Sequence, residues 1–120
     1  MKSLIDYREY DKGAAATNLP SMKDSFSEIP YEGKDLIVKY LDNGRKTAAA
    51  VGRAKDAFTG EEIPGEYYMM TDGEYSWISS LSYYVEKYNL RLPQIFEEKV
   101  MSLARDEVAF HEYLKRNSNS

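Results

Sequence analysis

The sequence predicts an α+β domain in which a small antiparallel β-meander or hairpin packs against one N-terminal helix and two or three C-terminal helices. Two β-prone runs, residues 66–71 and 74–78, flank Asp72 and Gly73. They predict a hairpin because Asp-Gly readily takes the positive φ angles of a type I′ turn. Apolar residues recur at helical spacing before and after this hairpin. With 120 residues, the chain has the size of one domain.

Residues 1–30 are expected to form a flexible or surface-wrapping N-terminal arm. They include a small, polar stretch at 13–18 and two prolines, Pro20 and Pro30. Parts of the arm are expected to be held to the body by its apolar side chains, Leu4, Ile5, Phe26 and Ile29. A single α+β domain over residues 31–116 and a disordered tail over residues 117–120 complete the predicted organisation.

The body is expected to begin with a helix over residues 34–41 and a strand over residues 46–58. The apolar residues of this helix share one face: Leu36, Ile37, Tyr40 and Leu41. Asn43 or Gly44 suits a left-handed C-cap at its end. Ala, Thr and Val predominate in the strand, where Gly52 indicates a bulge or bend.

A second helix is expected after the hairpin, over residues 81–88. One amphipathic face is formed by Leu81, Tyr84, Val85 and Tyr88. Ser79 or Ser80 is expected to cap its beginning, and Asn89 is expected to end it.

The last helical stretch covers residues 93–114, where Pro93 has the φ angle favoured at a first helical position. Its apolar spacing leaves open whether it forms one helix or two that separate near Arg105. A homodimer through this region is compatible with either arrangement.

The charges are unevenly distributed along the chain, whose net charge is −4. Residues 1–60 carry ten basic and nine acidic side chains, whereas residues 61–120 carry six and eleven. Residues 56–86, here called the acidic segment, contain no Lys or Arg but seven carboxylates and seven aromatic residues. An unneutralised acidic surface disfavours nucleic acid and favours a basic protein partner.

The residues that support catalysis or metal binding are scarce. The chain has no cysteine, which excludes disulfides and cysteine nucleophiles, and His111 is its single histidine. No nucleophile elbow or phosphate-binding loop occurs. Asp72 and Glu74 flank a turn that is too wet for acid–base chemistry and lack the ligand spacing of a calcium loop. We therefore expect no enzyme activity, no cofactor and no metal.

The N-terminus carries charges within its first nine residues, and no apolar run is long enough to span a membrane. We therefore expect a cytoplasmic protein that does not bind membranes.

Four stretches of the chain resemble a known class of proteins. They are residues 36–44, Leu-Ile-Val-Lys-Tyr-Leu-Asp-Asn-Gly; residues 56–63, Asp-Ala-Phe-Thr-Gly-Glu-Glu-Ile; residues 70–77, Met-Thr-Asp-Gly-Glu-Tyr-Ser-Trp; and residues 80–93, Ser-Leu-Ser-Tyr-Tyr-Val-Glu-Lys-Tyr-Asn-Leu-Arg-Leu-Pro. This order resembles small bacterial immunity proteins of toxin–immunity pairs, such as those of contact-dependent growth inhibition. The resemblance implies a cytoplasmic inhibitor that binds one toxin domain, and many such toxins are basic nucleases.

The hypothesis that joins these observations is a non-catalytic, immunity-type inhibitor that binds a basic toxin domain, such as a nuclease, through an acidic aromatic surface. The predicted partner-binding residues are Glu61, Glu62, Glu66, Tyr67, Asp72, Glu74, Tyr75, Trp77 and Tyr83. The sequence leaves open which face of the hairpin is buried. Aromatic residues on the buried face would belong to the core and not to a binding surface. The alternative is a small enzyme or ligand-binding domain that uses carboxylates and tyrosines in a pocket.

Overall fold

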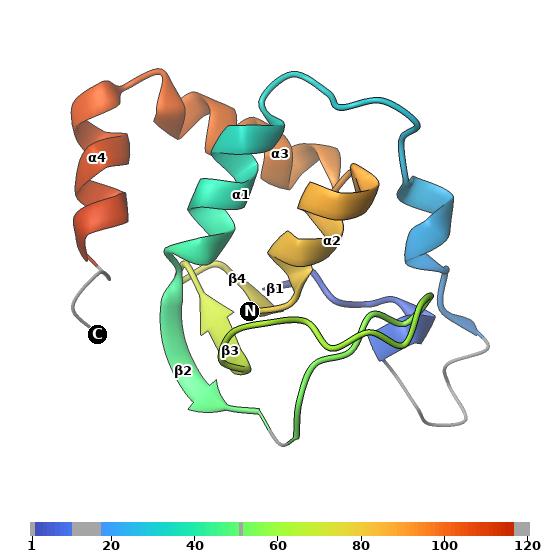
Figure 1. The fold of residues 1–120 in the computed structure, drawn as a ribbon. Helices are drawn as coiled ribbons and strands as arrows, with labels where there is room; N and C mark the ends of the chain where they lie inside the picture. Colours follow the sequence, from blue (N-terminus) through green and yellow to red (C-terminus); the bar gives the residue numbers. More distant parts are fainter. Residues whose placement is uncertain (1, 11–17, 51, 117–120) are drawn as a thin grey trace.

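The structure, a computed structural model, describes residues 2–10, 18–50 and 52–116. It confirms the α+β class: within these residues four helices accompany a four-stranded sheet (Figure 1). In chain order the elements are β1 (Lys2–Ser3), α1 (Lys34–Asp42), β2 (Arg45–Ala49), β3 (Tyr68–Thr71), β4 (Tyr75–Ile78), α2 (Leu81–Tyr88), α3 (Gln94–Ala104) and α4 (Glu107–Arg116). The predicted disordered tail, residues 117–120, lies outside the described residues.

The sheet has the strand order β1-β4-β3-β2. The predicted hairpin is confirmed, since β3 and β4 pair antiparallel with Met70 opposite Trp77. Strand β2 pairs antiparallel with β3 through a bulge between Lys46 and Ala48. The sheet is mixed rather than a pure meander, because β1 lies parallel to β4.

The strand predicted over residues 46–58 is shorter than expected and ends at Ala49. The chain then leaves the sheet, passes Gly52 with a φ of 84°, and forms a loop. Within this loop Lys55 and Glu62 make an isolated bridge. Residues 54–66 therefore form a separate projection beside the sheet, here called the 54–66 loop.

The described part of the N-terminal arm contributes strand β1 and buried side chains of the main core: Leu4, Tyr7 and Met22. Phe26 packs against this core, whereas Ile29 is exposed. The prediction that Ile29 holds the arm to the body is therefore wrong. A buried anchor that the sequence did not reveal is Met22, in the short 3-10 helix Met22–Ser25.

Helices α1 and α2 end differently from one another. The C-cap of α1 is Asn43, whose φ of −111° is not left-handed. Gly44 does not have a positive φ either, so the predicted left-handed cap is wrong at both residues. Helix α2 does end on a left-handed residue, Asn89, with a φ of 55°. Ser80 is the N-cap residue of α2 but makes no side-chain capping bond; its hydroxyl is instead paired with the Tyr10 hydroxyl at 2.9 Å.

The C-terminal helical stretch is two helices, α3 and α4, which separate at Arg105 and Asp106. Pro93 lies immediately before α3 rather than at its first position. Among the described helices, none combines the length and the apolar character that a membrane crossing requires.

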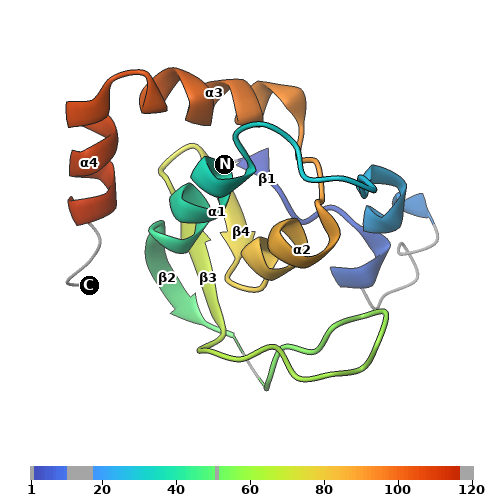
Figure 2. The same cartoon turned by 45° about the horizontal axis from the view of Figure 1, so that its top comes forward.

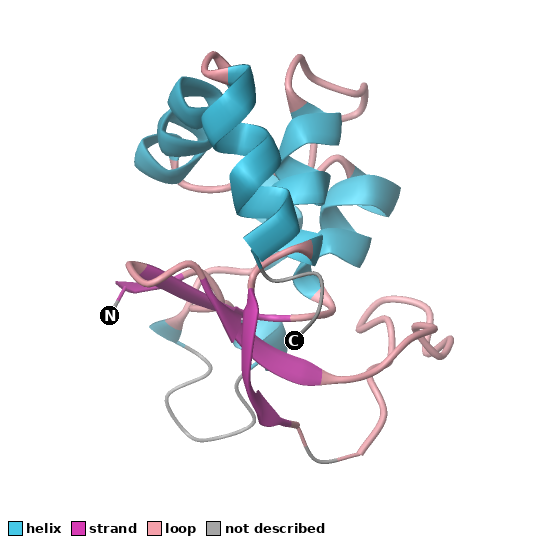
Figure 3. Cartoon of the chain, turned by 90° about the vertical axis from the view of Figure 1, so that its left-hand side faces the viewer, coloured by secondary structure: helices cyan, strands magenta, loops and turns pink. Residues whose placement is uncertain are grey.

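The helices lie on one side of the sheet (Figure 3), and the core fills the space between the two layers. Trp77 of β4 is fully buried there, with its ring 6.3 Å from that of Tyr40 in α1 and 6.1 Å from that of Phe96 in α3. Its indole nitrogen donates to the Leu41 carbonyl oxygen. A Cβ atom on Gly44 would lie 2.5 Å from the Trp77 ring, so this position requires glycine.

Candidate functional site

The acidic segment is largely neutralised by cations from other parts of the chain. Five of its seven carboxylates form ion pairs: Lys2–Glu74, Lys46–Glu66, Arg53–Glu62, Lys87–Asp56, Lys99–Asp72 and Lys99–Glu74, at N–O distances of 2.9 to 3.8 Å. The prediction of an unneutralised surface is therefore wrong for most of the segment. Within the described residues, Glu61 and Glu86 are the members without an ion pair.

The hairpin half of the predicted site belongs mainly to the core. Tyr75 and Trp77 are buried on the face of the sheet that the helices cover, so they offer no surface to a partner. The Asp72 side chain is also buried, with 1% exposure, and accepts hydrogen bonds from Tyr40 at 2.6 Å and Lys99 at 2.9 Å. Glu74 stays exposed but is paired with two lysines.

The buried Asp72 stabilises the hairpin turn. Besides Tyr40 and Lys99, the backbone amides of Glu74 and Tyr75 donate to its carboxylate at 2.9 and 2.7 Å. Burial opposes ionisation of this carboxylate, but these four donors outweigh that effect and lower the pKa of Asp72. Asp72 thus holds together the turn, α1 and α3.

The remaining predicted residues gather at the 54–66 loop and the neighbouring face of α2. Glu61, Glu62 and Glu66 are exposed, and Tyr67 and Tyr83 are half-buried. Figure 2 shows α1 and α2 lying side by side above the sheet, with the loop passing beneath α2 in that view. The structure therefore separates the predicted set into a buried hairpin part and an accessible loop part.

A groove of about 690 Å³ lies between α1, α2, β3 and residues 63–66 of the loop. Its apolar lining consists of Val38, Ile63, Pro64, Tyr68 and Met70. Its charged lining consists of Asp42, Glu66, Glu86, Lys46 and Lys87. Glu66 and Tyr83 are the two predicted site residues that line it, and we call it the α1–α2 groove.

The charges in the α1–α2 groove do not cancel. Lys46 pairs with Glu66 at 3.8 Å, and Lys87 pairs with Asp56 behind the groove wall. Asp42 and Glu86 have no ion pair within the described part of the chain. Partial burial raises the pKa of Asp42; a hydrogen bond with Ser82 opposes that shift, and the nearby Glu86 carboxylate adds to it. The groove therefore keeps an excess of negative charge beside an apolar floor.

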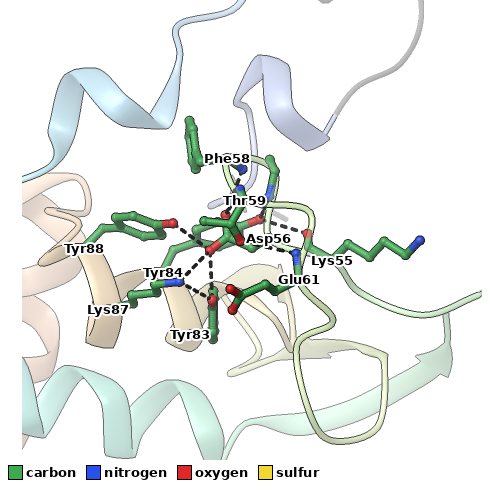
Figure 4. Close-up of polar contacts among 10 residues, drawn as sticks. Lys55, Asp56, Phe58, Thr59, Glu61, Tyr83, Tyr84, Lys87 and Tyr88 are labelled. Atoms are coloured by element: carbon green, nitrogen blue, oxygen red, sulfur yellow. Dashed lines mark hydrogen bonds and ion pairs between the residues drawn. The ribbon is translucent and has the colours of Figure 1, made fainter.

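The 54–66 loop is joined to α2 around the side chain of Asp56, which is 1% exposed (Figure 4). Three side chains of α2 donate to one oxygen of its carboxylate: Tyr88 at 2.6 Å, Tyr83 at 2.8 Å and Lys87 at 3.3 Å. The amides of Phe58 and Thr59 donate to the other oxygen at 2.8 and 3.2 Å.

The electrostatics of this cluster favour ionised Asp56 and protonated neighbours. Burial opposes ionisation, but the five donors outweigh it and hold the pKa of Asp56 well below 3.8. The hydrogen bond with Tyr83 and the one with Asp56 raise the pKa of Lys87. Burial, together with the bond to Asp56, raises the pKa of Tyr88 to about 12. Asp56 and Lys87 thus form a stable ion pair at neutral pH.

Asp42 and Glu86 are the groove residues that sequence reasoning missed. Asp42 follows the predicted helix 34–41 directly, and Glu86 is the last residue of the acidic segment. They meet because α1 packs against α2, and a single sequence contains no direct signal for that pairing.

A second hollow, of about 770 Å³, lies along α3. Arg91 and Glu97 line it and bind each other through two hydrogen bonds of 2.7 and 3.1 Å. None of the predicted partner-binding residues lines this hollow. Because this hollow contains none of the predicted residues, and because Arg91 and Glu97 neutralise each other, the α1–α2 groove is the better candidate site.

No family model matches this chain, and neither the curated proteins nor the solved structures contain a match to it. Within the described residues no group of three or more His, Asp or Glu side chains could hold a metal ion.

Proposed function

We propose that this protein is a non-catalytic, immunity-type inhibitor that binds a basic toxin domain in the α1–α2 groove. The observation that carries the proposal is the pair of carboxylates, Asp42 and Glu86, that have no ion pair in the described chain and lie beside an apolar floor. Such a groove suits a partner segment that combines Lys or Arg with apolar side chains. The cytoplasm is the compartment in which we expect this inhibitor to act.

The groove offers a basic partner both electrostatic steering and apolar surface to bury. Negative potential in a concave site attracts a cationic partner and raises its association rate. Apolar lining residues such as Tyr68 and Ile63 then provide apolar surface that is removed from water on binding. Tyr83 is half-buried at the same place, and tyrosine is enriched among residues that dominate binding energy.

The proposal is tested with the reading frame next to the gene for this chain. If that frame encodes a toxin domain, its expression should stop bacterial growth, and co-expression of this protein should restore it. Glu86→Lys should abolish the restoration, because it places a cation where the partner's cation binds. The matched control is Glu112→Lys, an exposed glutamate of α4 outside the groove, which should restore growth fully.

Two results would contradict the proposal. One is growth restored equally by the Glu86→Lys and Glu112→Lys variants, which would remove the groove from the interface. The other is the absence of any toxin that this protein neutralises among its neighbouring reading frames.

One observation favours the alternative, a small enzyme or ligand-binding domain. The groove places Asp42, with its raised pKa, together with Tyr68 and Tyr83, which is the carboxylate–tyrosine combination that such a domain would use. A small cationic ligand fits the same charges. Thermal unfolding with spermidine tests this: saturable stabilisation that Asp42→Asn abolishes would support the alternative, and no stabilisation would argue against it.

A further inference from the structure

Two residues of α2 face both the α1–α2 groove and the buried Asp56. Tyr83 and Lys87 line the groove, and both donate to the same carboxylate oxygen of Asp56, at 2.8 and 3.3 Å. Lys87 also donates to the Tyr83 hydroxyl at 3.0 Å. Asp56 itself does not line the groove. Its carboxylate therefore acts on the groove through these two side chains.

We propose that Asp56 is a positioning residue for partner binding: it holds the Lys87 ammonium and the Tyr83 phenol at the groove wall, so that the groove stays net negative, and it fixes the loop that forms the opposite wall. This inference rests on the proposed function, because it assumes that a cationic partner segment enters the groove.

The effect of Asp56 on the charge of the groove follows from the ion pairs. Asp56 compensates Lys87, as Glu66 compensates Lys46, and Asp42 and Glu86 remain for the partner. An uncharged residue at position 56 would leave the Lys87 charge uncompensated in a groove that holds the carboxylates a partner needs. The negative charge available to a cationic partner would then fall by one unit.

The loop step follows from the backbone contacts of the same residue. The Asp56 carboxylate accepts from the amides of Phe58 and Thr59, and the Asp56 amide donates to the Glu61 carbonyl oxygen at 2.8 Å. The Ile63 amide donates to the Ala54 carbonyl oxygen at 2.9 Å. These bonds close the loop just before residues 63–66, which line the groove.

Further contacts between the 54–66 loop and α2 lie beside the Asp56 carboxylate. The Tyr84 hydroxyl accepts from the Ala57 amide at 2.9 Å and donates to the Lys55 carbonyl oxygen at 3.2 Å. The Phe58 ring packs edge-on against Tyr88, at 5.5 Å between centroids. Loss of the Asp56 charge should therefore loosen the loop first, while the β3–β4 hairpin keeps its own contacts.

The test uses the full chain and a cationic apolar probe, the peptide acetyl-(Lys-Leu)3-amide, with binding followed by NMR titration. Asp56→Asn should weaken probe binding by about threefold to tenfold, in line with the loss of one charge in a concave site. The double variant Asp56→Asn, Lys87→Met should recover most of that loss, because no uncompensated cation remains. Asp24→Asn, an exposed aspartate outside the groove, is the matched control and should bind as the unmodified protein does.

Hydrogen exchange supplies a readout that does not need the probe. In Asp56→Asn the amides of Phe58 and Thr59 should exchange at least about tenfold faster, since both lose their charged acceptor. Amides of β3 and β4 should keep their rates. If this variant fails to fold, the NMR signal of the Lys87 ammonium group is measured in the unmodified protein. The inference predicts that the ammonium hydrogens are protected from exchange with water. Exchange as fast as that of a solvent-exposed lysine would overturn it.

The outcomes separate the two proposals. If the unmodified protein does not bind the probe, the proposed groove function is wrong, while the exchange rates still test Asp56. If the probe binds and Asp56→Asn changes neither its affinity nor the loop amides, the positioning role is overturned. A double variant that binds as weakly as Asp56→Asn would overturn the electrostatic step.

Discussion

Two stretches of the acidic segment, the loop half at residues 56–66 and the hairpin half at residues 67–78, both combine carboxylates with aromatic residues but have different structural roles. In the hairpin half, residues 67–78, the aromatic side chains Tyr75 and Trp77 are core and Asp72 is buried. In the loop half, residues 56–66, one carboxylate, Asp56, is buried and the other acidic side chains are exposed. The difference lies in what covers each half, because the helices pack over the hairpin and leave the outer side of the loop open.

Both halves contain one buried aspartate that is held by tyrosine and lysine. Asp72 accepts from Tyr40 and Lys99, and Asp56 accepts from Tyr83, Tyr88 and Lys87. The first connects three core elements, whereas the second connects a loop to one helix at the edge of a groove. Similar chemistry therefore supports global stability in one half and local geometry in the other.

The largest expected difference between the halves is in global stability. Trp77→Ala should lower the free energy of unfolding by about 3–5 kcal/mol, because it empties the centre of a packed core. Glu61→Ala in the loop half should change it by less than about 0.5 kcal/mol. Urea denaturation of both variants measures this difference. A Trp77→Ala loss below about 1 kcal/mol would contradict the assignment of the hairpin to the core.

A smaller difference is expected between the two buried aspartates. Asp72→Asn should cost about 2 kcal/mol of unfolding free energy, since it weakens charge-assisted hydrogen bonds within the main core. Asp56→Asn should lower the free energy of global unfolding by less, but it should speed the amide exchange of the 54–66 loop. Urea denaturation combined with hydrogen exchange distinguishes them. If both variants lost the same free energy of unfolding and kept slow amide exchange in the 54–66 loop, the two sites would not differ.

The pH dependence of stability also differs between the buried aspartates and the groove. The folded state lowers the pKa of both Asp56 and Asp72, so their stabilising contributions are complete above the ordinary value of 3.8 and are lost as the pH falls below it. The raised pKa of Asp42 has the opposite sign: stability falls as the pH rises from 3.8 through its folded-state value. Carboxyl-carbon NMR titration should therefore show Asp42 titrating last of the three on acid-to-base titration. A midpoint for Asp42 below those of Asp56 and Asp72 would contradict this.

The sequence was sufficient to predict the hairpin and the first two helices, but not strand β1, the end of β2 or which residues cover each element. The Asp-Gly turn and the apolar spacing of residues 81–88 depend on local geometry, and both predictions are confirmed. The partner of each carboxylate depends on tertiary contacts, so the neutralisation of Asp72 by Lys99 and of Glu74 by Lys2 could not be read from neighbouring residues. The same reason explains why Asp42 was missed as a groove residue.

The claim that a basic partner binds at the groove and not at the hairpin is tested by the association rate of that partner. Glu86→Lys in the groove and Glu74→Lys in the hairpin make the same charge change, and each is compared with the unmodified protein against the toxin domain encoded beside it. We predict that Glu86→Lys slows association about tenfold and weakens its salt dependence, whereas Glu74→Lys changes it less than about twofold. A larger effect from Glu74→Lys than from Glu86→Lys would contradict the claim.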